Sequence, residues 1–312
     1  MKTAFRLMLV SLLFVGTASL VKAQAPAVNH DTWTSGSAMP TARMSAAAGA
    51  IGTNIYVIGG YVPGNVVGVN EIYNTKKNTW TTGASDPNPR AFAGYAVVNK
   101  ILYIFGGSNG SLLNIAESYD PATDTWTTLA SMLHIQATTS AVADKDVIYV
   151  IGGLDDTGFL TTVESYNIAT NTWTEEAPLL VAKGWSAVGL LGTTVVAADG
   201  GNSASNLGDN EGYNVKKNAW SELTADPTPR VPGCYAAIKG HLYVAGGQDA
   251  NGNLITLNEA YNPKTKSWTT LAPMPVDTGY GSASVDAGSR LYCFGGGSYP
   301  NTVYNNVQIY QP

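Results

Sequence analysis

Residues 55–60 read Ile-Tyr-Val-Ile-Gly-Gly, a short apolar run closed by two glycines. The pattern returns five more times, as ILYIFGG at 101–107, VIYVIGG at 147–153, VVAADGG at 195–201, HLYVAGG at 241–247 and RLYCFGG at 290–296. The six glycine pairs follow one another at intervals of 46 to 49 residues. A fixed period of this length indicates a repeat architecture, so one repeat decides the fold.

Two further marks follow each of the first five glycine pairs in constant order. The first is a Glu-x-Tyr triplet, which begins at Glu71, Glu117, Glu164, Glu211 and Glu259. The second is a tryptophan seven residues after each of these tyrosines, at Trp80, Trp126, Trp173, Trp220 and Trp268. With the small apolar stretch before each run, every repeat predicts four short strands, here called a to d. Because strand b is apolar at consecutive positions, both its faces should be buried, as in a propeller blade.

The two ends of the chain complement one another. The sixth repeat ends at Gln308-Ile-Tyr310, so it has strands a, b and c but no tryptophan strand. Asp31-Thr-Trp33-Thr reads as a strand d that no a, b or c strand precedes. The N-terminal strand is therefore expected to complete the sixth blade, which also removes two exposed sheet edges.

The order Gly-Gly, Glu-x-Tyr and Trp at this spacing resembles the kelch repeat, over about residues 31–312. The resemblance implies an all-β, six-bladed kelch β-propeller with four antiparallel strands in each blade. It also implies that residues 31–312 form one domain.

The first residues resemble a secretory signal. Lys2 and Arg6 precede a short apolar stretch at 7–15, and Ala23 and Ala25 offer cleavage sites. We expect a signal peptide over 1–23, a short lead over 24–30 and a secreted or periplasmic protein without a later membrane-spanning stretch. An N-terminal anchor helix is the alternative, but the apolar stretch is short for one. Loss of the segment, with three basic residues and no acid, lowers the net charge from −5 to −8. That charge argues against a nucleic-acid partner.

The two cysteines, Cys234 and Cys293, lie in predicted strands of different repeats. They are too few for a disulfide scaffold, so the sequence favours two unpaired thiols. A single disulfide is the alternative in an exported chain.

Residues that recur in every blade are first structural, and the five glutamates are expected to be hydrogen-bonding residues of this kind. A binding site should instead lie where repeats differ, on the face formed by the d–a and b–c loops. Before strand a, Arg43, Arg90 and Arg230 each lie 16 residues before the first glycine. The same register gives Gln136, Gly184 and Gly279 in the other repeats, with His134, Lys183, Trp185 and Tyr280 beside them. The kelch resemblance implies that such arginines face a pocket for an acidic partner. Bracing of the loops is the alternative.

The fourth repeat departs furthest from the pattern. In our alignment, Asp199 stands where the other repeats have Ile58, Phe105, Ile151, Ala245 and Phe294. A carboxylate at this place should be partly buried and should need a partner. Together with Lys183 and Trp185 it could form a site for a sugar or a small polar ligand, and the alternative is that it caps its own loop.

The predicted ligand-binding residues are therefore Arg43, Arg90, Gln136, Lys183, Trp185, Asp199, Arg230 and Tyr280. We expect a non-enzymatic binding module for a protein, peptide or glycan, without cofactor or metal. The alternative is a carbohydrate enzyme of the sialic-acid mutarotase type, with Asp199 and an arginine in a central pocket. A scaffold without activity is a third possibility. The sequence contains no phosphate-binding loop, zinc spacing or nucleophile elbow.

Overall fold

The computed structural model describes residues 30–281 and 283–312. The predicted signal peptide, residues 1–23, and residues 24–29 of the predicted lead lie outside the described residues. Every regular element in the described part is a β-strand, which confirms the all-β prediction. Within the same ranges, the chain forms no helix of the length and apolar character that a membrane crossing requires.

Twenty-four strands form six antiparallel sheets of four, one for each predicted blade. In the order a to d, the strands of the first three blades are β2 (Ala47–Ile51), β3 (Asn54–Ile58), β6 (Asn70–Asn74), β7 (Thr79–Gly83), then β8 (Gly94–Val98), β9 (Ile101–Phe105), β10 (Ala116–Asp120), β11 (Thr125–Thr128), then β12 (Ser140–Asp144), β13 (Val147–Asp155), β14 (Gly158–Asn167) and β15 (Thr172–Glu175). Those of the last three are β16 (Ala187–Leu191), β17 (Thr194–Gly201), β18 (Asn206–Asn214), β19 (Ala219–Glu222), then β21 (Cys234–Ile238), β22 (His241–Ala245), β24 (Asn258–Asn262), β25 (Ser267–Leu271), then β26 (Ala283–Asp286), β27 (Leu291–Phe294), β30 (Val307–Gln311) and β1 (Thr32–Gly36).

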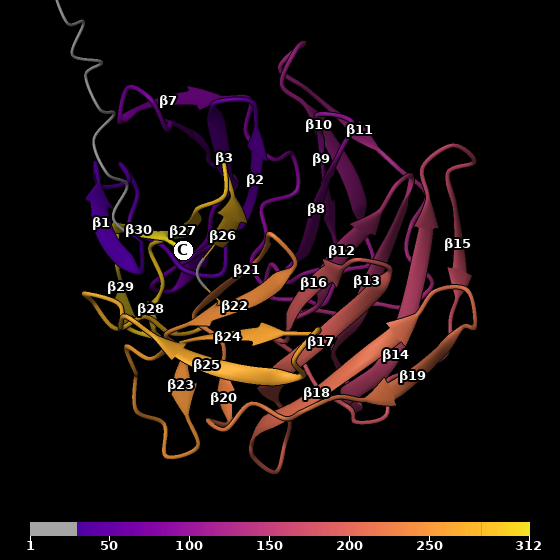
Figure 1. Ribbon diagram of the computed structural model, residues 1–312. Coiled ribbons are helices and arrows are strands. Elements are labelled where there is room, and N and C mark those ends of the chain that lie inside the picture. Colours follow the sequence, from indigo (N-terminus) through magenta and orange to yellow (C-terminus); the bar gives the residue numbers. More distant parts are fainter. Residues whose placement is uncertain (1–29, 282) are drawn as a thin grey trace, which may run out of the picture.

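The blades stand around a common centre. Figure 1 shows the six a strands gathered at the centre and the six d strands at the rim. Two short hairpins project from b–c connections, β4 (Tyr61–Val62) with β5 (Asn65–Val66) and β28 (Gly297–Ser298) with β29 (Thr302–Val303). In the fifth blade, β20 (Arg230–Val231) in the loop before strand a pairs with β23 (Gln248–Asp249) in the b–c connection. The predicted six-bladed propeller is thus confirmed.

The N-terminal strand closes the ring as predicted. Strand β1 pairs antiparallel with β30, and Trp33 lies opposite Tyr310. The same Trp–Tyr pairing recurs in the other blades, for example between Trp80 and Tyr73. The sixth blade is therefore built from both ends of the described chain.

The strand-d tryptophans connect each blade to the one before it. Each donates its indole N–H to a backbone carbonyl that follows the preceding blade's strand d. Trp80 donates to the Ser37 carbonyl at 2.8 Å, and Trp33 completes the circle by donating to the Ala272 carbonyl at 2.8 Å. Each tryptophan ring packs on the c-strand tyrosine of its own blade, and its N–H group bonds to the preceding blade. The same residue type therefore stabilises each blade and joins neighbouring blades around the ring.

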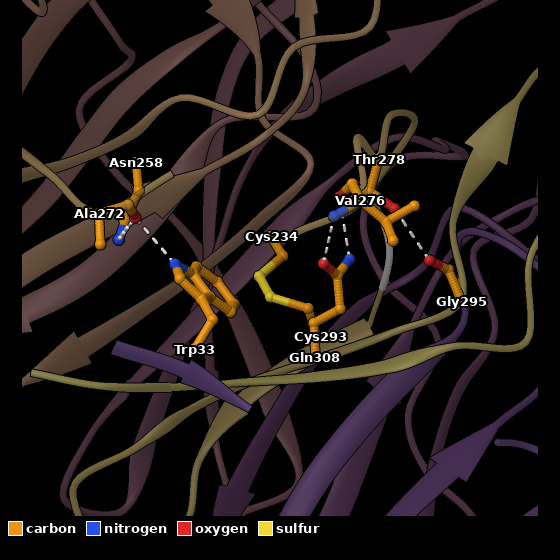
Figure 2. The surroundings of a disulfide bond; sticks show 9 residues. All are labelled: Trp33, Cys234, Asn258, Ala272, Val276, Thr278, Cys293, Gly295 and Gln308. Atoms are coloured by element: carbon orange, nitrogen blue, oxygen red, sulfur yellow. Dashed lines mark hydrogen bonds between the residues drawn. A yellow bond between two sulfur atoms is a disulfide. The ribbon is translucent and has the colours of Figure 1, made fainter. Parts of the chain in front are cut away.

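Cys234 and Cys293 form a disulfide, so the expectation of two unpaired thiols was wrong. Cys234 lies on β21 of the fifth blade and Cys293 on β27 of the sixth, with Cα atoms 5.8 Å apart. Figure 2 shows the bond between the two blades, beside the Val276–Gln308 pairing. Different repeats indicated distant positions, but neighbouring blades pack face to face, which brings the two strands together.

Candidate functional site

The d–a and b–c loops of each blade meet at one end of the propeller, here called the mouth. In the first three blades, backbone bridges join Met44 to Tyr61, Ala91 to Ser108 and Ala137 to Leu154. Comparable pairings join Gly184 to Gly201 and Gly279 to Gly297. The d–a and b–c loops therefore lie on one face of the propeller, as predicted from the sequence.

The predicted arginines do not face the mouth. Arg43 is 0% exposed, and its guanidinium forms an ion pair with Glu71 on β6 of its own blade. It also donates to the Val57 carbonyl at 2.9 Å. Glu71 accepts a further bond of 2.7 Å from the Thr41 hydroxyl. This arrangement is a clamp that ties the entering loop to strands b and c, which is the bracing role set out as the alternative.

The second and fifth blades add a second carboxylate to this clamp. Arg90 pairs with Glu117 and with Asp86, whose Oδ2 lies 3.1 Å from the Arg90 Nε. Arg230 pairs in the same way with Glu259 at 2.5 Å and Asp226 at 2.8 Å. Burial raises the pKa of Asp86 to about 6 and the pKa of Glu259 to about 7, against the opposing pull of the arginines.

In the remaining blades other residues hold the same glutamate position. Glu164 accepts bonds from the Leu133 and His134 amides and the His134 ring, so His134 belongs to a clamp. In the fourth blade Lys183 pairs with Glu211 at 3.2 Å and with Asp209. In the sixth, Gln308 exchanges two hydrogen bonds with the Val276 backbone. The expectation that the repeated acids are structural is supported by these bonds.

The sequence alignment of the fourth and sixth blades was wrong by one residue. Asp199 and Gly200 have φ of 57° and 112°, which match 67° and 110° at Gly59 and Gly60. Asp199 therefore stands at the first glycine of the pair, and Ala198 pairs with Ala187 as Ile58 pairs with Ala47. It follows that Lys183, not Gly184, is the counterpart of the arginines.

The same correction applies to the sixth blade. The carbonyls of Arg90 and Thr278 accept the amides of Gly60 and Gly247, the second glycines of the preceding blades' pairs. Thr278, not Gly279, therefore occupies the arginine position. Its hydroxyl donates to the Gly295 carbonyl at 3.0 Å instead of reaching a glutamate.

Asp199 is more deeply buried than predicted, at 0% exposed. Its Oδ2 lies 3.7 Å from the Arg230 Nε, the one contact that brings two predicted site residues with opposite charge together. Neither carboxylate oxygen accepts a hydrogen bond of normal geometry from the described residues. Burial, followed by the nearby Asp226, raises the pKa of Asp199 well above its usual range, although Arg230 opposes the shift.

A ring of residues two positions after the clamp position surrounds the axis at the mouth. It contains Ser45, Phe92, Thr138, Trp185, Pro232 and Tyr280. Backbone bonds link neighbours in this ring, from the Phe92 amide to Ser45, from Thr138 to Phe92 and from Trp185 to Thr138. The positive φ of Trp185 (56°) and Tyr280 (55°) turns the chain at this point. Both are predicted site residues, and both lie at the mouth.

Two adjacent hollows lie at this ring. The outer one, here called the cup, has a volume of about 270 Å³ and is lined mainly by Phe92, Leu112, Leu154, Trp185, Tyr280 and Tyr299. The inner one, here called the floor, has a volume of about 40 Å³ and includes Thr138, Thr139 and Ser140. Phe92, Thr138 and Trp185 line both hollows, so the two lie next to one another. The described residues that line either hollow carry no charge.

The aromatic rings of the cup form a connected arc. Trp185 contacts Tyr280 with ring centroids 6.5 Å apart, Tyr280 contacts Tyr299 at 6.0 Å, and Tyr299 contacts Phe92 at 6.3 Å. Phe92 and Tyr299 escaped the sequence analysis. Phe92 lies two residues after Arg90, just as Trp185 lies two residues after Lys183. This shared spacing could have identified Phe92 from the sequence. Tyr299 lies in a b–c loop without a repeat register, so no sequence signal marked it.

Comparisons with known proteins agree with this architecture. A family model described as the Attractin/LZTR1 beta-propeller matches residues 55–298. Kelch-like protein 21 of Rattus norvegicus is 41% identical over 56 residues, which are 18% of this chain and 9% of that protein. The matched stretch thus spans less than a tenth of that relative. The solved structure titled "Structure of YjhT" has a TM-score of 0.75 and 17% identity, over 87% of this chain and 95% of that one. At that identity the likeness concerns the fold.

Proposed function

Since the chain belongs to the Attractin/LZTR1 β-propeller family, we propose that it is a non-enzymatic binding module whose ligands enter the aromatic cup. Kelch-type propellers are typically interaction modules. The observation that carries the proposal is the lining of the cup, which combines four aromatic rings with no charged side chain among the described residues. Concave, mainly apolar hollows with a few polar groups are the usual form of a binding site.

The buried clamps favour this function over the mutarotase-like alternative. An acid and an arginine could act on a ligand only if they reached it. Asp199 and Arg230 lie together, but both are 0% exposed and neither lines the cup or the floor. The charges of Arg43, Arg90 and Arg230 are engaged by carboxylates within the blades. Their placement supports a structural role, not a catalytic one.

We also propose that the protein works in an oxidising compartment after export. The support is the signal-like sequence of residues 1–23 together with the Cys234–Cys293 disulfide. Disulfides persist in secreted and periplasmic proteins and are rare in reducing ones. Sequencing the N-terminus of the protein from its native host tests this, since export predicts a new terminus near Ala23 or Ala25.

The binding function is tested with arrays of peptides and glycans. Tyr299→Ala removes a half-exposed cup residue, and Leu180→Ala is the matched control, because Leu180 is 51% exposed against 49% for Tyr299 but lies outside the cup lining. We expect array ligands of the wild type to be retained by Leu180→Ala and to bind Tyr299→Ala at least about tenfold more weakly, by the usual cost of an aromatic contact residue. Equal binding to all three proteins, or chemical conversion of a bound ligand detected by mass spectrometry, contradicts the proposal.

A further inference from the structure

Another hollow opens at the mouth beside the cup, lined by the b–c loops of the first and second blades. This hollow, here called the side groove, has a volume of about 280 Å³, and its lining includes Tyr61, Asn65, Ser108 and Asn109. Phe92, Ser108 and Tyr299 line both the side groove and the cup, so the two hollows are adjacent. No charged side chain of the described residues lines the side groove. One extended ligand can therefore occupy both hollows.

The side groove presents hydrogen-bond donors. The Tyr61 hydroxyl accepts the Gly64 amide at 3.0 Å, and the Asn109 side-chain carbonyl accepts the amide two residues further on at 3.3 Å. The Ser108 hydroxyl accepts the Gly110 amide at 3.2 Å. None of these three side chains donates a hydrogen bond to another described residue, so each keeps an O–H or N–H group for a ligand. Asn109 and the two glycines are exposed and the other two residues are half-buried, so a ligand in the groove can reach these donors.

We propose that the side groove and the cup together bind a proline-rich segment of a partner protein in the polyproline II conformation. This inference rests on the proposed function and names its ligand class. Proline has no backbone N–H, so a run of prolines offers carbonyl acceptors without backbone donors. The polyproline II helix makes no internal hydrogen bonds, which leaves those carbonyls for the donors of the side groove. Because the segment already has this conformation when free, it loses little conformational entropy on binding.

The aromatic rings at the mouth suit the other part of this ligand, its pyrrolidine rings. Tyr61 contacts Tyr299 with ring centroids 5.2 Å apart, which extends the aromatic arc of the cup into the side groove. Tyr299 is 49% exposed and lines both hollows, so it stands where the segment would pass from one to the other. Grooves lined by aromatic side chains are a recurring form of site for proline-rich segments.

Other ligand classes fit the two hollows less well. A charged segment would lose its hydration and meet no opposite charge, because the described linings are uncharged and Arg43, Arg90 and Arg230 are engaged inside the blades. A segment without proline brings one backbone N–H for every carbonyl, and these donors would face donors in the side groove. A sugar ring would stack on the aromatic rings, but each of its hydroxyls would also bring a donor. Of these classes, the proline-rich segment alone combines apolar rings with acceptors.

The test measures the binding of three labelled probes by fluorescence polarisation: decaproline, a glycine-serine decamer, and maltohexaose as a neutral glycan. The wild type should bind decaproline at least about tenfold more tightly than the glycine-serine decamer, which is flexible and brings backbone donors. Tyr61→Phe keeps the aromatic ring and removes one donor, and Ser108→Ala removes another. Each should weaken decaproline binding about threefold to tenfold, the worth of one hydrogen bond. Tyr304→Phe is the matched control and should bind as the wild type does, because Tyr304 lies in a b–c loop but lines neither hollow.

Thermal unfolding of the variants shows whether they fold, and each should melt as the wild type does, since the changes lie at the surface. Decaproline that binds no better than the glycine-serine decamer overturns the inference. Equal affinity of the wild type, Tyr61→Phe and Ser108→Ala for decaproline does so too, because the side-groove donors would then not contact the ligand. Binding of maltohexaose in place of decaproline would show that the mouth takes a glycan. That result overturns this inference but leaves the proposed binding function standing.

Discussion

Asp199 is the residue at which this chain departs furthest from its own repeat. The corresponding position is glycine in the other five blades, and Asp199 adopts the same left-handed φ of 57°. An aspartate pays a steric cost there that a glycine does not. Its carboxyl is also a third acid beside Arg230, which Asp226 and Glu259 already engage. The junction of the first and second blades has the same clamp with Gly59 in this place, and so serves as an internal reference.

We predict that Asp199→Gly stabilises the protein by at least about 1 kcal/mol at pH 4, from relief of the left-handed conformation. The gain should grow toward pH 7. The pKa of Asp199 is raised in the folded protein, whereas an unfolded aspartate ionises above about pH 4. Folding therefore takes up a proton, and stability falls as the pH rises through this window. Urea unfolding of both proteins at pH 4 and pH 7 measures the difference.

The reverse exchange is the matched control. Gly59→Asp places a carboxyl at the reference junction, where even a Cβ atom would lie 2.6 Å from the Arg90 carbonyl oxygen. It should destabilise the protein, and more so at pH 7 than at pH 4. A loss of stability in Asp199→Gly would show that Asp199 holds Arg230 in place.

At the scale of one blade, the clamp between the loop before strand a and the Glu-x-Tyr strand is the recurring device. A buried ion pair adds little net stability, but a buried charge left without its partner is costly. The sixth blade shows how the device works without charge, since Thr278 and Gln308 stand where Arg43 and Glu71 stand in the first. A buried glutamate at this place therefore needs donors of its own, which the third blade supplies from His134 and two backbone amides in place of an arginine.

We predict that Arg43→Thr lowers the free energy of unfolding by about 3 kcal/mol, because it leaves the buried carboxylate of Glu71 without its cation. The double variant Arg43→Thr, Glu71→Gln places the two uncharged residues of the sixth blade at these positions and should recover at least about 1 kcal/mol of that loss, because no buried charge is then left without a partner. Denaturant unfolding of the two single variants and the double variant gives the coupling directly. Additive losses would contradict the clamp as a coupled unit.

The strands of each blade were predictable from sequence, while the cup was not. Buried b strands and Glu-x-Tyr triplets recur because every blade packs against its neighbours in the same way. With several copies of the pattern, an irregular residue in one repeat does not hide the strands. The sequence analysis misaligned Asp199 because Gly200 and Gly201 look like the glycine pair of the other repeats. In the structure the pair is Asp199 and Gly200, since aspartate can adopt the left-handed conformation that glycine usually has there. Trp185 and Tyr280 were predicted by register. Phe92 and Tyr299 belong to the second and sixth blades, which are far apart in the sequence. They meet at the mouth only because the six blades close into a ring.

In the whole molecule, two devices hold the sixth blade in the ring. Strand β1 completes the sixth blade, and the disulfide ties that blade to the fifth. Each blade otherwise contacts its neighbours through side-chain packing, the tryptophan bonds and the backbone hydrogen bonds at the mouth. A break at one seam would open the ring, and with it the mouth that the six d–a loops form together.

We predict that the variant with both Cys234→Ala and Cys293→Ala loses about 4 kcal/mol of stability, the chain-entropy value for a sequence separation of 59 residues. Thermal unfolding of the wild type with and without reductant should show a loss in the same direction. Alkylation of the unfolded, unreduced protein supplies the control, since a bonded pair leaves no thiol to react. Two alkylated cysteines in the untreated protein would contradict the bond.

Fluorine NMR of protein labelled with 5-fluorotryptophan locates the place where a ligand binds. Of the seven tryptophans, six lie in d strands at the rim and only Trp185 lines the cup. Its signal is assigned by its loss in Trp185→Phe. Titration with an array ligand that the wild type binds should shift the Trp185 signal and leave the other six in place. A bound ligand that shifts the signal of a d-strand tryptophan while that of Trp185 stays unchanged would show that the ligand binds outside the cup.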